Sequence, residues 1–229
     1  MSDAVVGRDA ELAALVRALD RAAQGDLAVA LVAGEPGIGT SRLVDALAAE
    51  ARGRGIRVVW AEARDDQHAP LRLWSPVERA LCARGPGPSV TCQRRSGWEL
   101  LDLLVAGLAD AAPVVVALDD LHWADEASVW VLERLPRRLA GHGVLLVGAT
   151  RGEPGATPLT DVRRQADPVV ELEGLDLDAA ERLVDALALA GPVDAPTWSS
   201  APAATRCSSA SSWRWATGAT GCRRPCPTC

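Results

Sequence analysis

A glycine-rich segment carries the first pattern in this sequence that could do chemistry. It reads Gly-Glu-Pro-Gly-Ile-Gly-Thr-Ser over residues 34–41 and follows an apolar run at residues 27–33. Glycines let backbone N–H groups turn inward around a phosphate, and the start of a following helix adds partial positive charge. The pattern G-x-x-x-x-G-K-[ST] between a strand and a helix is a phosphate-binding loop. We therefore predict a site for ATP or ADP, formed by Glu35, Pro36, Gly37, Ile38, Gly39, Thr40, Ser41 and Arg42.

One position of the loop departs from this pattern, because Thr40 stands where the pattern has Lys. That lysine bridges the outer phosphates and neutralises charge during phosphoryl transfer, which a threonine hydroxyl cannot do. Ser41 keeps the hydroxyl that binds Mg²⁺ in such loops. The sequence thus predicts nucleotide binding with weak or absent hydrolysis. The alternative is a glycine-rich turn that binds no ligand.

A second pattern is the apolar strand at residues 114–120, Val-Val-Val-Ala-Leu-Asp-Asp, which ends in two carboxylates. In phosphate-loop proteins the first such Asp orients the Mg²⁺ shell, and the next acid polarises the attacking water. We assign Asp119, together with Ser41, to the metal, and Asp120 to catalysis. The alternative is a strand that ends in a solvated acidic turn.

A third apolar run, at residues 144–151, ends in Gly-Ala-Thr-Arg. Ligand sites of parallel sheets gather at the carboxyl ends of the strands. Arg151 is therefore a second catalytic candidate, because it could reach the outer phosphate from a neighbouring strand end. A surface salt bridge is an equally open interpretation of this arginine.

The elements that must position these residues alternate along the chain. Apolar runs predict strands at residues 27–33, 56–60, 114–118, 144–147 and 169–172. Helical periodicity predicts helices at residues 1–24, 41–51, 71–82, 98–108, 127–139 and 177–187. Such alternation predicts an α/β fold with a mostly parallel sheet flanked by helices.

Composition excludes several classes of protein. Hydrophobic residues make up 48% of the 229 residues and charged residues 24%, so general disorder is excluded. No apolar run approaches the roughly 18 residues of a membrane span, and the N-terminus lacks the features of a signal peptide, so we expect a cytoplasmic protein without membrane contact. Residues 1–194 hold 20 Arg and 30 acidic residues, a net charge of −10, which argues against direct nucleic-acid binding by this segment.

Four stretches together resemble the nucleotide-binding domain of large LuxR-type transcriptional regulators, which belong to the signal-transducing branch of the AAA+ ATPases. They are Val-Gly-Arg-Asp-Ala-Glu-Leu at residues 6–12, the glycine-rich loop, Leu-Asp-Asp-Leu-His-Trp-Ala-Asp at 118–125 and Gly-Ala-Thr-Arg at 148–151. The third stretch is the most specific, because a general acidic strand does not require His122 or Trp123, which we expect to pack and orient the loop. The resemblance implies a P-loop NTPase fold acting as a regulatory ATP switch, with Gly7 and Arg8 near the adenine.

The resemblance covers about residues 4–190 and divides the chain. We expect a P-loop nucleotide-binding domain at residues 1–173, the beginning of a helical lid at 174–194 and a disordered tail at 195–229. The sensor region and DNA-binding helices of such regulators are not recognisable here, so DNA binding is not expected, and the sequence identifies no protein partner. Three hypotheses stay open: a regulatory module with a degenerate phosphate loop, an active ATPase in which another group replaces the lysine, and a nonfunctional gene fragment.

We predict that the tail from about residue 195 is read in a shifted frame. Beyond Asp194 the chain holds no acidic residue and no Leu, while Trp, Cys, Ser and Arg are frequent. Regrouping its codons so that each begins at an old third position permits GGNPLFV from residue 203 and then RELVALGDGRDGLPAAVPDV, which has the pattern of the lid of these regulators. Resequencing codons 190–229 should show an intact downstream frame after one inserted or deleted base. A tail that is protected from hydrogen exchange and packed on the sheet would contradict the prediction.

Overall fold

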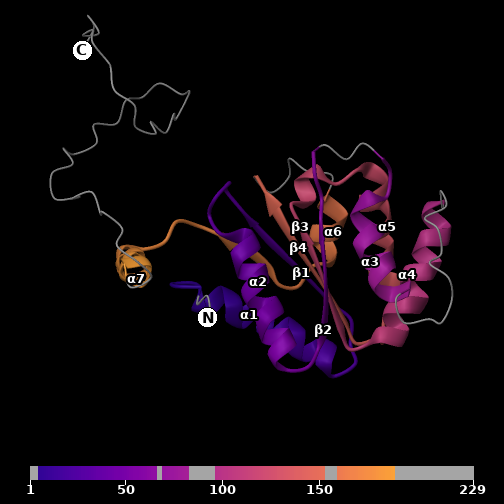
Figure 1. Ribbon diagram of the computed structural model, residues 1–229, viewed down its shortest axis with the longest axis horizontal. Helices are drawn as coiled ribbons and strands as arrows, with labels where there is room; N and C mark the ends of the chain where they lie inside the picture. Colours follow the sequence, from indigo (N-terminus) through magenta and orange to yellow (C-terminus); the bar gives the residue numbers. More distant parts are fainter. Residues whose placement is uncertain (1–4, 66–68, 83–95, 153–158, 189–229) are drawn as a thin grey trace, which may run out of the picture. The chain divides into compact units, whose positions relative to one another are not determined.

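The computed structural model describes residues 5–65, 69–82, 96–152 and 159–188 (Figure 1). The predicted nucleotide-binding residues, from the glycine-rich loop to Arg151, lie within these ranges. The tail assigned to a shifted frame lies outside the described residues, as does the end of the predicted lid.

A five-stranded sheet forms the centre of the fold. Its strands are β1 (Ala28–Gly34), β2 (Arg57–Glu62), β3 (Val114–Asp119), β4 (Val144–Arg151) and β5 (Val169–Leu172). Their order in the sheet is β2-β3-β4-β1-β5, and every neighbouring pair is parallel. Since β1 and β3 both pair with β4, the ends of these three strands lie side by side at one edge of the sheet.

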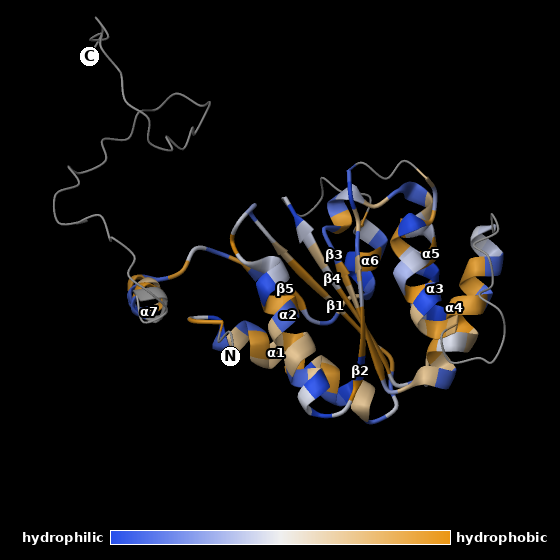
Figure 2. Ribbon diagram, in the orientation of Figure 1, coloured by the Kyte–Doolittle hydropathy of each residue, from blue (hydrophilic) through white to orange (hydrophobic). Residues whose placement is uncertain are grey.

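Helices cover both faces of this sheet (Figures 1 and 2). The helices α1 (Asp9–Ala23) and α2 (Thr40–Gly53) bury apolar residues against one face. The other face is covered by α3 (Ser75–Cys82), α4 (Gly97–Ala111), α5 (Glu126–Arg138) and the short α6 (Thr160–Gln165). A last helix, α7 (Leu177–Ala188), follows β5. The α/β fold with a parallel sheet flanked by helices is thereby confirmed. None of the helices within the described ranges is long and apolar enough to cross a membrane.

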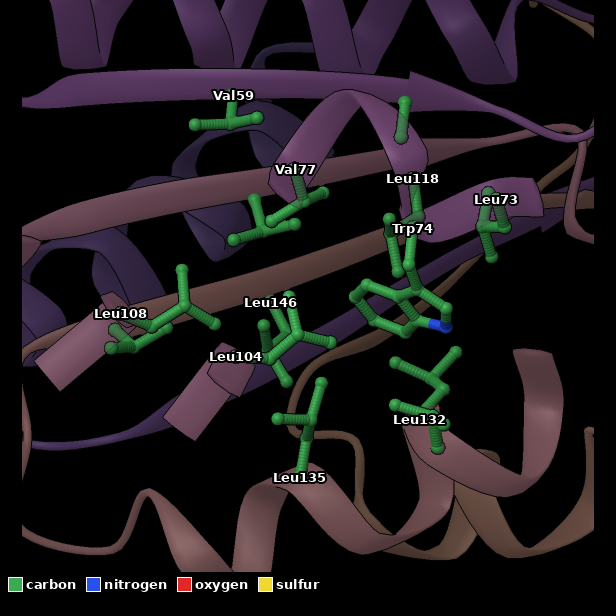
Figure 3. Close-up of a cluster of buried hydrophobic side chains, with 14 of the residues drawn as sticks. Val59, Leu73, Trp74, Val77, Leu104, Leu108, Leu118, Leu132, Leu135 and Leu146 are labelled. Carbon is green, nitrogen blue, oxygen red and sulfur yellow. The ribbon is translucent and has the colours of Figure 1, made fainter. Parts of the chain in front are cut away.

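Two apolar clusters, one on each face of the sheet, form the core between the sheet and its helices. All six residues of β3 are buried, as expected for a strand covered on both faces. Leu104, Leu132 and Leu146 meet in the larger apolar cluster (Figure 3). Trp74 is fully buried in the same cluster, and its indole Nε1 donates a hydrogen bond of 3.1 Å to the carbonyl oxygen of Ser128. This bond ties the 3₁₀ turn Arg72–Trp74 to the start of α5.

Four features differ from the sequence-based prediction. The helix expected at residues 1–24 begins only at Asp9, and residues 5–8 are not helical, because Gly7 has a φ angle of +74° that a right-handed helix does not allow. The strand expected at 144–147 continues to Arg151, because Gly148 and Ala149 are small and weaken the apolar signal. A Cβ at Gly148 would lie 2.5 Å from Leu121 Cδ1, so a larger residue there would force the buried Leu121 side chain to shift. The helix α6 was not predicted, because its six residues are too few for a periodicity to show. The helix expected at 71–82 begins as a 3₁₀ turn and becomes α-helical at Ser75.

Candidate functional site

The glycine-rich loop between β1 and α2 has a shape that its glycines make possible. Gly37 and Gly39 have φ angles of +84° and +105°, which side chains other than glycine rarely adopt. The N–H of Ile38 donates to the carbonyl oxygen of Glu35 at 3.1 Å and closes the turn. Gly34 is needed for space, because a Cβ there would lie 2.6 Å from Ile38 Cγ2. Local sequence therefore dictates the loop conformation.

The loop leads directly into the N-terminus of α2, which starts at Thr40. No side chain caps this helix, and no acidic residue lies in its first turn. The partial positive charge of the helix start is therefore not compensated from within the helix, which favours an anion at this place. Thr40 is buried, and Arg42 is exposed on α2.

A hydrogen bond joins the loop helix to the acidic strand. The Ser41 hydroxyl donates to Asp119 Oδ1 at 2.9 Å, and the N–H of Asp120 donates to the same oxygen at 2.9 Å. Burial raises the pKa of the Asp119 carboxyl, and the two hydrogen bonds oppose this effect. Asp119 thus lies enclosed, next to a hydroxyl, at the end of β3.

Asp120 occupies a strained turn beyond β3, with a φ angle of +52°. Its carboxylate Oδ1 lies 3.1 Å from Arg151 Nε at the end of β4, so these two catalytic candidates form an ion pair. His122 Nδ1 lies 3.8 Å from the same oxygen, and this buried nitrogen has no hydrogen-bond partner among the described residues. Burial lowers the pKa of His122 and Arg151 lowers it further, although Asp120 opposes this. We therefore treat the imidazole as neutral at pH 7.

The structure also places two residues in surroundings that the sequence did not predict. Glu62 pairs in register with Asp119 at the end of β2, and its charge adds to the raised pKa of the Asp119 carboxyl. The strand predicted from the sequence ends at residue 60, so no sequence signal pointed to Glu62, which is the last residue of β2. Trp123 is 46% exposed and does not pack as expected, because the turn Leu121–Trp123 directs its indole outward. Its ring lies 5.0 Å from that of His122.

Gly7 and Arg8 do not join this cluster through any contact described for them. The Arg8 side chain is buried and donates to the carbonyl oxygen of Glu173 and, at 3.1 Å, to Glu11 Oε1. Gly7 has a φ angle of +74°, and a Cβ there would lie 2.4 Å from Ala179 Cβ. These two residues connect the beginning of the described chain to the start of α7.

The residues at the loop fit a nucleotide phosphate and a magnesium ion in all but one respect. A Cβ added at Gly37 or Gly39 would meet no atom within 4 Å, so space lies beside the loop. The hydroxyl of Ser41 and the carboxylate of Asp119 are hard oxygen donors of the kind that Mg²⁺ prefers. Thr40 supplies no charge where the phosphate-loop pattern has a lysine.

The sequence of residues 4–147, more than half of the chain, matches the family model of the AAA ATPase domain. The chain belongs to the AAA ATPase domain family. No curated protein matches the sequence of this AAA domain.

Solved structures share the fold of this AAA domain at low sequence identity. The ORC1 protein of Aeropyrum pernix in complex with DNA matches with a TM-score of 0.64 and 21% identity, over 82% of this chain and 50% of that chain. The HORMA:CdnC:Trip13 complex of E. coli MS115-1 matches with a TM-score of 0.55 and 14% identity, over 80% and 68%. AMPPCP-bound DnaA from Aquifex aeolicus matches with a TM-score of 0.50 and 15% identity, over 83% and 53%. The AAA domain thus has the P-loop NTPase fold and spans about half the length of the ORC1 and DnaA chains.

The raised pKa of Asp119 predicts a pH-dependent effect of the Asp119→Asn substitution. Because the folded state holds the proton of this carboxyl more tightly, ionising it costs stability as the pH rises above the ordinary value of 3.8. Asparagine carries no such cost and keeps an oxygen that can accept from Ser41. Without Mg²⁺ or nucleotide, we expect the variant to unfold at a higher temperature than the unchanged protein at pH 7.5, with the difference shrinking toward pH 4. Thermal unfolding followed by circular dichroism measures it, and a variant that is less stable at pH 7.5 would contradict this effect of burial.

Proposed function

We propose that this AAA domain is the nucleotide-binding regulatory switch of a LuxR-type transcriptional regulator, with weak or absent hydrolysis. The observation that carries the proposal is the hydrogen bond of 2.9 Å between Ser41 and Asp119, which joins the glycine-rich loop to the acidic strand. A hydroxyl and a carboxylate in this position form a site for the magnesium ion of Mg-ATP or Mg-ADP. The AMPPCP-bound DnaA supports the proposal, because a protein of the same fold holds this nucleotide analogue.

The chain's own residues would bind and orient the nucleotide. Backbone N–H groups around Gly37 and Gly39, with the start of α2, would hold the phosphates. Ser41 and Asp119, which hydrogen-bond to each other here, would hold the metal ion. Magnesium, when bound, neutralises phosphate charge. Thr40 contributes no such charge, so we expect the loop to bind phosphates without stabilising their transfer.

Arg151 would let the switch distinguish ATP from ADP. Its guanidinium pairs with Asp120 at 3.1 Å, and its side chain is 45% exposed, so the pair can open at small cost. We expect Arg151 to exchange Asp120 for an outer phosphate, which would release the Asp120 carboxylate. The Arg151–Asp120 ion pair would then be broken with ATP and kept with ADP, so the turn at residues 120–123 would differ between the two bound states.

The regulator assignment rests on the resemblance of residues 118–125 to LuxR-type regulators. Within it, residues 1–173 form the nucleotide-binding domain and residues 174–194 begin the lid, while DNA binding belongs to parts of such regulators not recognised in this chain. Gly7 and Arg8 would lie near the adenine. The close approach of Gly7 to Ala179 on α7, and the hydrogen bond from Arg8 to Glu173 ahead of that helix, would couple this end of the site to α7. Closure of the lid could then follow nucleotide binding.

The missing lysine predicts weak nucleotide binding that Thr40→Lys improves. One charge-assisted contact to phosphate contributes on the order of 1.5–3 kcal/mol, which corresponds to roughly tenfold to a hundredfold in affinity. We expect calorimetric titration with Mg-ATP to show this gain in the variant. Asp119→Asn in the Thr40→Lys background is the control, because it removes the metal ligand while keeping the new charge. Equal affinities of the unchanged and Thr40→Lys proteins would sink the proposal for Thr40, and no nucleotide binding by either would favour a nonfunctional fragment.

An active ATPase is the second candidate, because Arg151 brings a cation to the end of β4 that could replace the lysine. If the regulatory proposal holds, phosphate release is negligible in the unchanged protein and partly restored in Thr40→Lys. Adding Asp120→Asn to Thr40→Lys should then lower the restored rate by on the order of 10²–10⁴, since general-base catalysis contributes that much. A phosphate-release assay on these proteins and on Arg151→Ala decides between the candidates. Robust turnover by the unchanged protein, lost in Arg151→Ala, would establish the active ATPase instead.

A further inference from the structure

The strand β2 presents an open edge to its surroundings. It is the last strand of the sheet and pairs only with β3. The N–H of Ala63 donates to the carbonyl oxygen of Asp119 at 3.0 Å, on the β3 side. Because successive residues of a strand direct their backbone groups to alternate sides, Trp60 and Glu62 direct theirs to the open side. Among the described residues, none forms a backbone hydrogen bond with them there.

A cavity of about 290 Å³ lies at this edge. Its strand residues are Trp60, Ala61 and Glu62, whose side chains point alternately to the two faces of the sheet. Ala61 belongs to the apolar cluster under α3, whereas Trp60 packs against the cluster under α2. The cavity therefore lies along the end of β2, on the side of the sheet that the 3₁₀ turn and α3 cover. We name it the edge groove, and its remaining lining residues are Arg64, Arg72, Ser75, Pro76 and Arg79.

The edge groove is cationic although the chain as a whole is acidic, with a net charge of −6. Three arginines and one glutamate line it. Arg72 and Arg79 are seven residues apart, so they lie about two turns apart on one side of the helix formed by the 3₁₀ turn and α3. Within the described ranges, neither side chain has a hydrogen bond or an ion pair given for it, whereas Arg64 lies 3.4 Å from Glu62 Oε2. Two exposed guanidinium groups are therefore available to a ligand.

We propose that the edge groove binds an acidic peptide in extended conformation, which adds to the sheet beside β2. The backbone groups of Trp60 and Glu62 supply the hydrogen bonds of strand addition, and these match a peptide main chain. Alternate side chains of such a peptide face α3, where carboxylates meet Arg72 and Arg79. A nucleic-acid strand offers no N–H and C=O groups at the spacing of a strand, so the open backbone favours a peptide.

A second explanation for the arginines is protection of the edge. Charged side chains on edge strands discourage pairing with other chains. In that case the arginines would keep peptides away, and their removal would promote aggregation of the protein. The two explanations predict opposite effects of the same substitutions on peptide binding.

Fluorescence anisotropy with the full chain tests the proposal, with the labelled peptide Glu-Val-Glu-Val-Glu-Val-Glu as the probe. We expect saturable binding that weakens with added salt and falls roughly tenfold in Arg72→Ala/Arg79→Ala, since two charge-assisted contacts are lost. The matched control is Arg17→Ala/Arg164→Ala, which removes the same charge from exposed arginines on α1 and α6 outside the groove. It should bind like the unchanged protein.

Hydrogen exchange separates strand addition from simple charge attraction. The bound peptide should slow exchange of the Trp60 and Glu62 amides, and a peptide with Pro in place of each Val should not bind, because proline cannot donate to a strand. Equal binding of the proline peptide, or full competition by inorganic phosphate, would reduce the groove to an anion site and overturn the proposal. Absence of binding together with aggregation of Arg72→Ala/Arg79→Ala would show that the arginines only protect the edge.

Discussion

The hydrogen bond from Ser41 to Asp119 joins residues 78 positions apart in the chain, and the candidate nucleotide site depends on it. It exists because β1 and β3 both pair in parallel with β4. The glycine-rich loop and the acidic turn therefore both follow the carboxyl ends of neighbouring parallel strands. If β3 ran antiparallel, Asp119 would lie at the other end of the strands, away from the glycine-rich loop. The direction of three strands therefore decides whether the hydroxyl and the carboxylate can hold one metal ion.

That arrangement leaves two carboxylates with different surroundings. Asp119 is buried and accepts hydrogen bonds from the Ser41 hydroxyl and a backbone N–H, and no cation pairs with it among the described residues. These surroundings suit a ligand of a metal ion. Asp120 already has its cation in Arg151 and is held in a left-handed turn. A conformation of this kind costs free energy, which the packing of Leu121 in the core can offset. The adjacent acids are thus suited to separate tasks, one in binding and one in responding to what is bound.

The phosphate loop lacks a positively charged side chain at residue 40, whereas arginines cluster beside the edge strand β2. Thr40 leaves the loop without a side-chain cation, although the helix start still favours anions. Arg72 and Arg79 carry positive charge beside β2 that no acidic side chain of the described residues pairs with, on a chain with a net charge of −6. Nucleotide binding and partner binding would then rest on different physical terms: backbone dipoles and a metal ion in one place, and guanidinium groups with an open strand edge in the other.

Sequence alone determined the local features of this protein, because these depend on neighbours along the chain. The glycines at 37 and 39 dictate the loop conformation, and the apolar runs specify the central strands, so the α/β fold could be predicted. Small residues such as Gly148 obscured the end of β4, and α6 was too short to detect. Only the tertiary structure decided which side chains meet. The pairing of Asp120 with Arg151, the approach of Glu62 to Asp119 and the attachment of Arg8 to Glu173 all follow from strand order and helix placement. The edge groove could not be read from the sequence for the same reason, since local periodicity carries no information about which strand lies at the edge of a sheet.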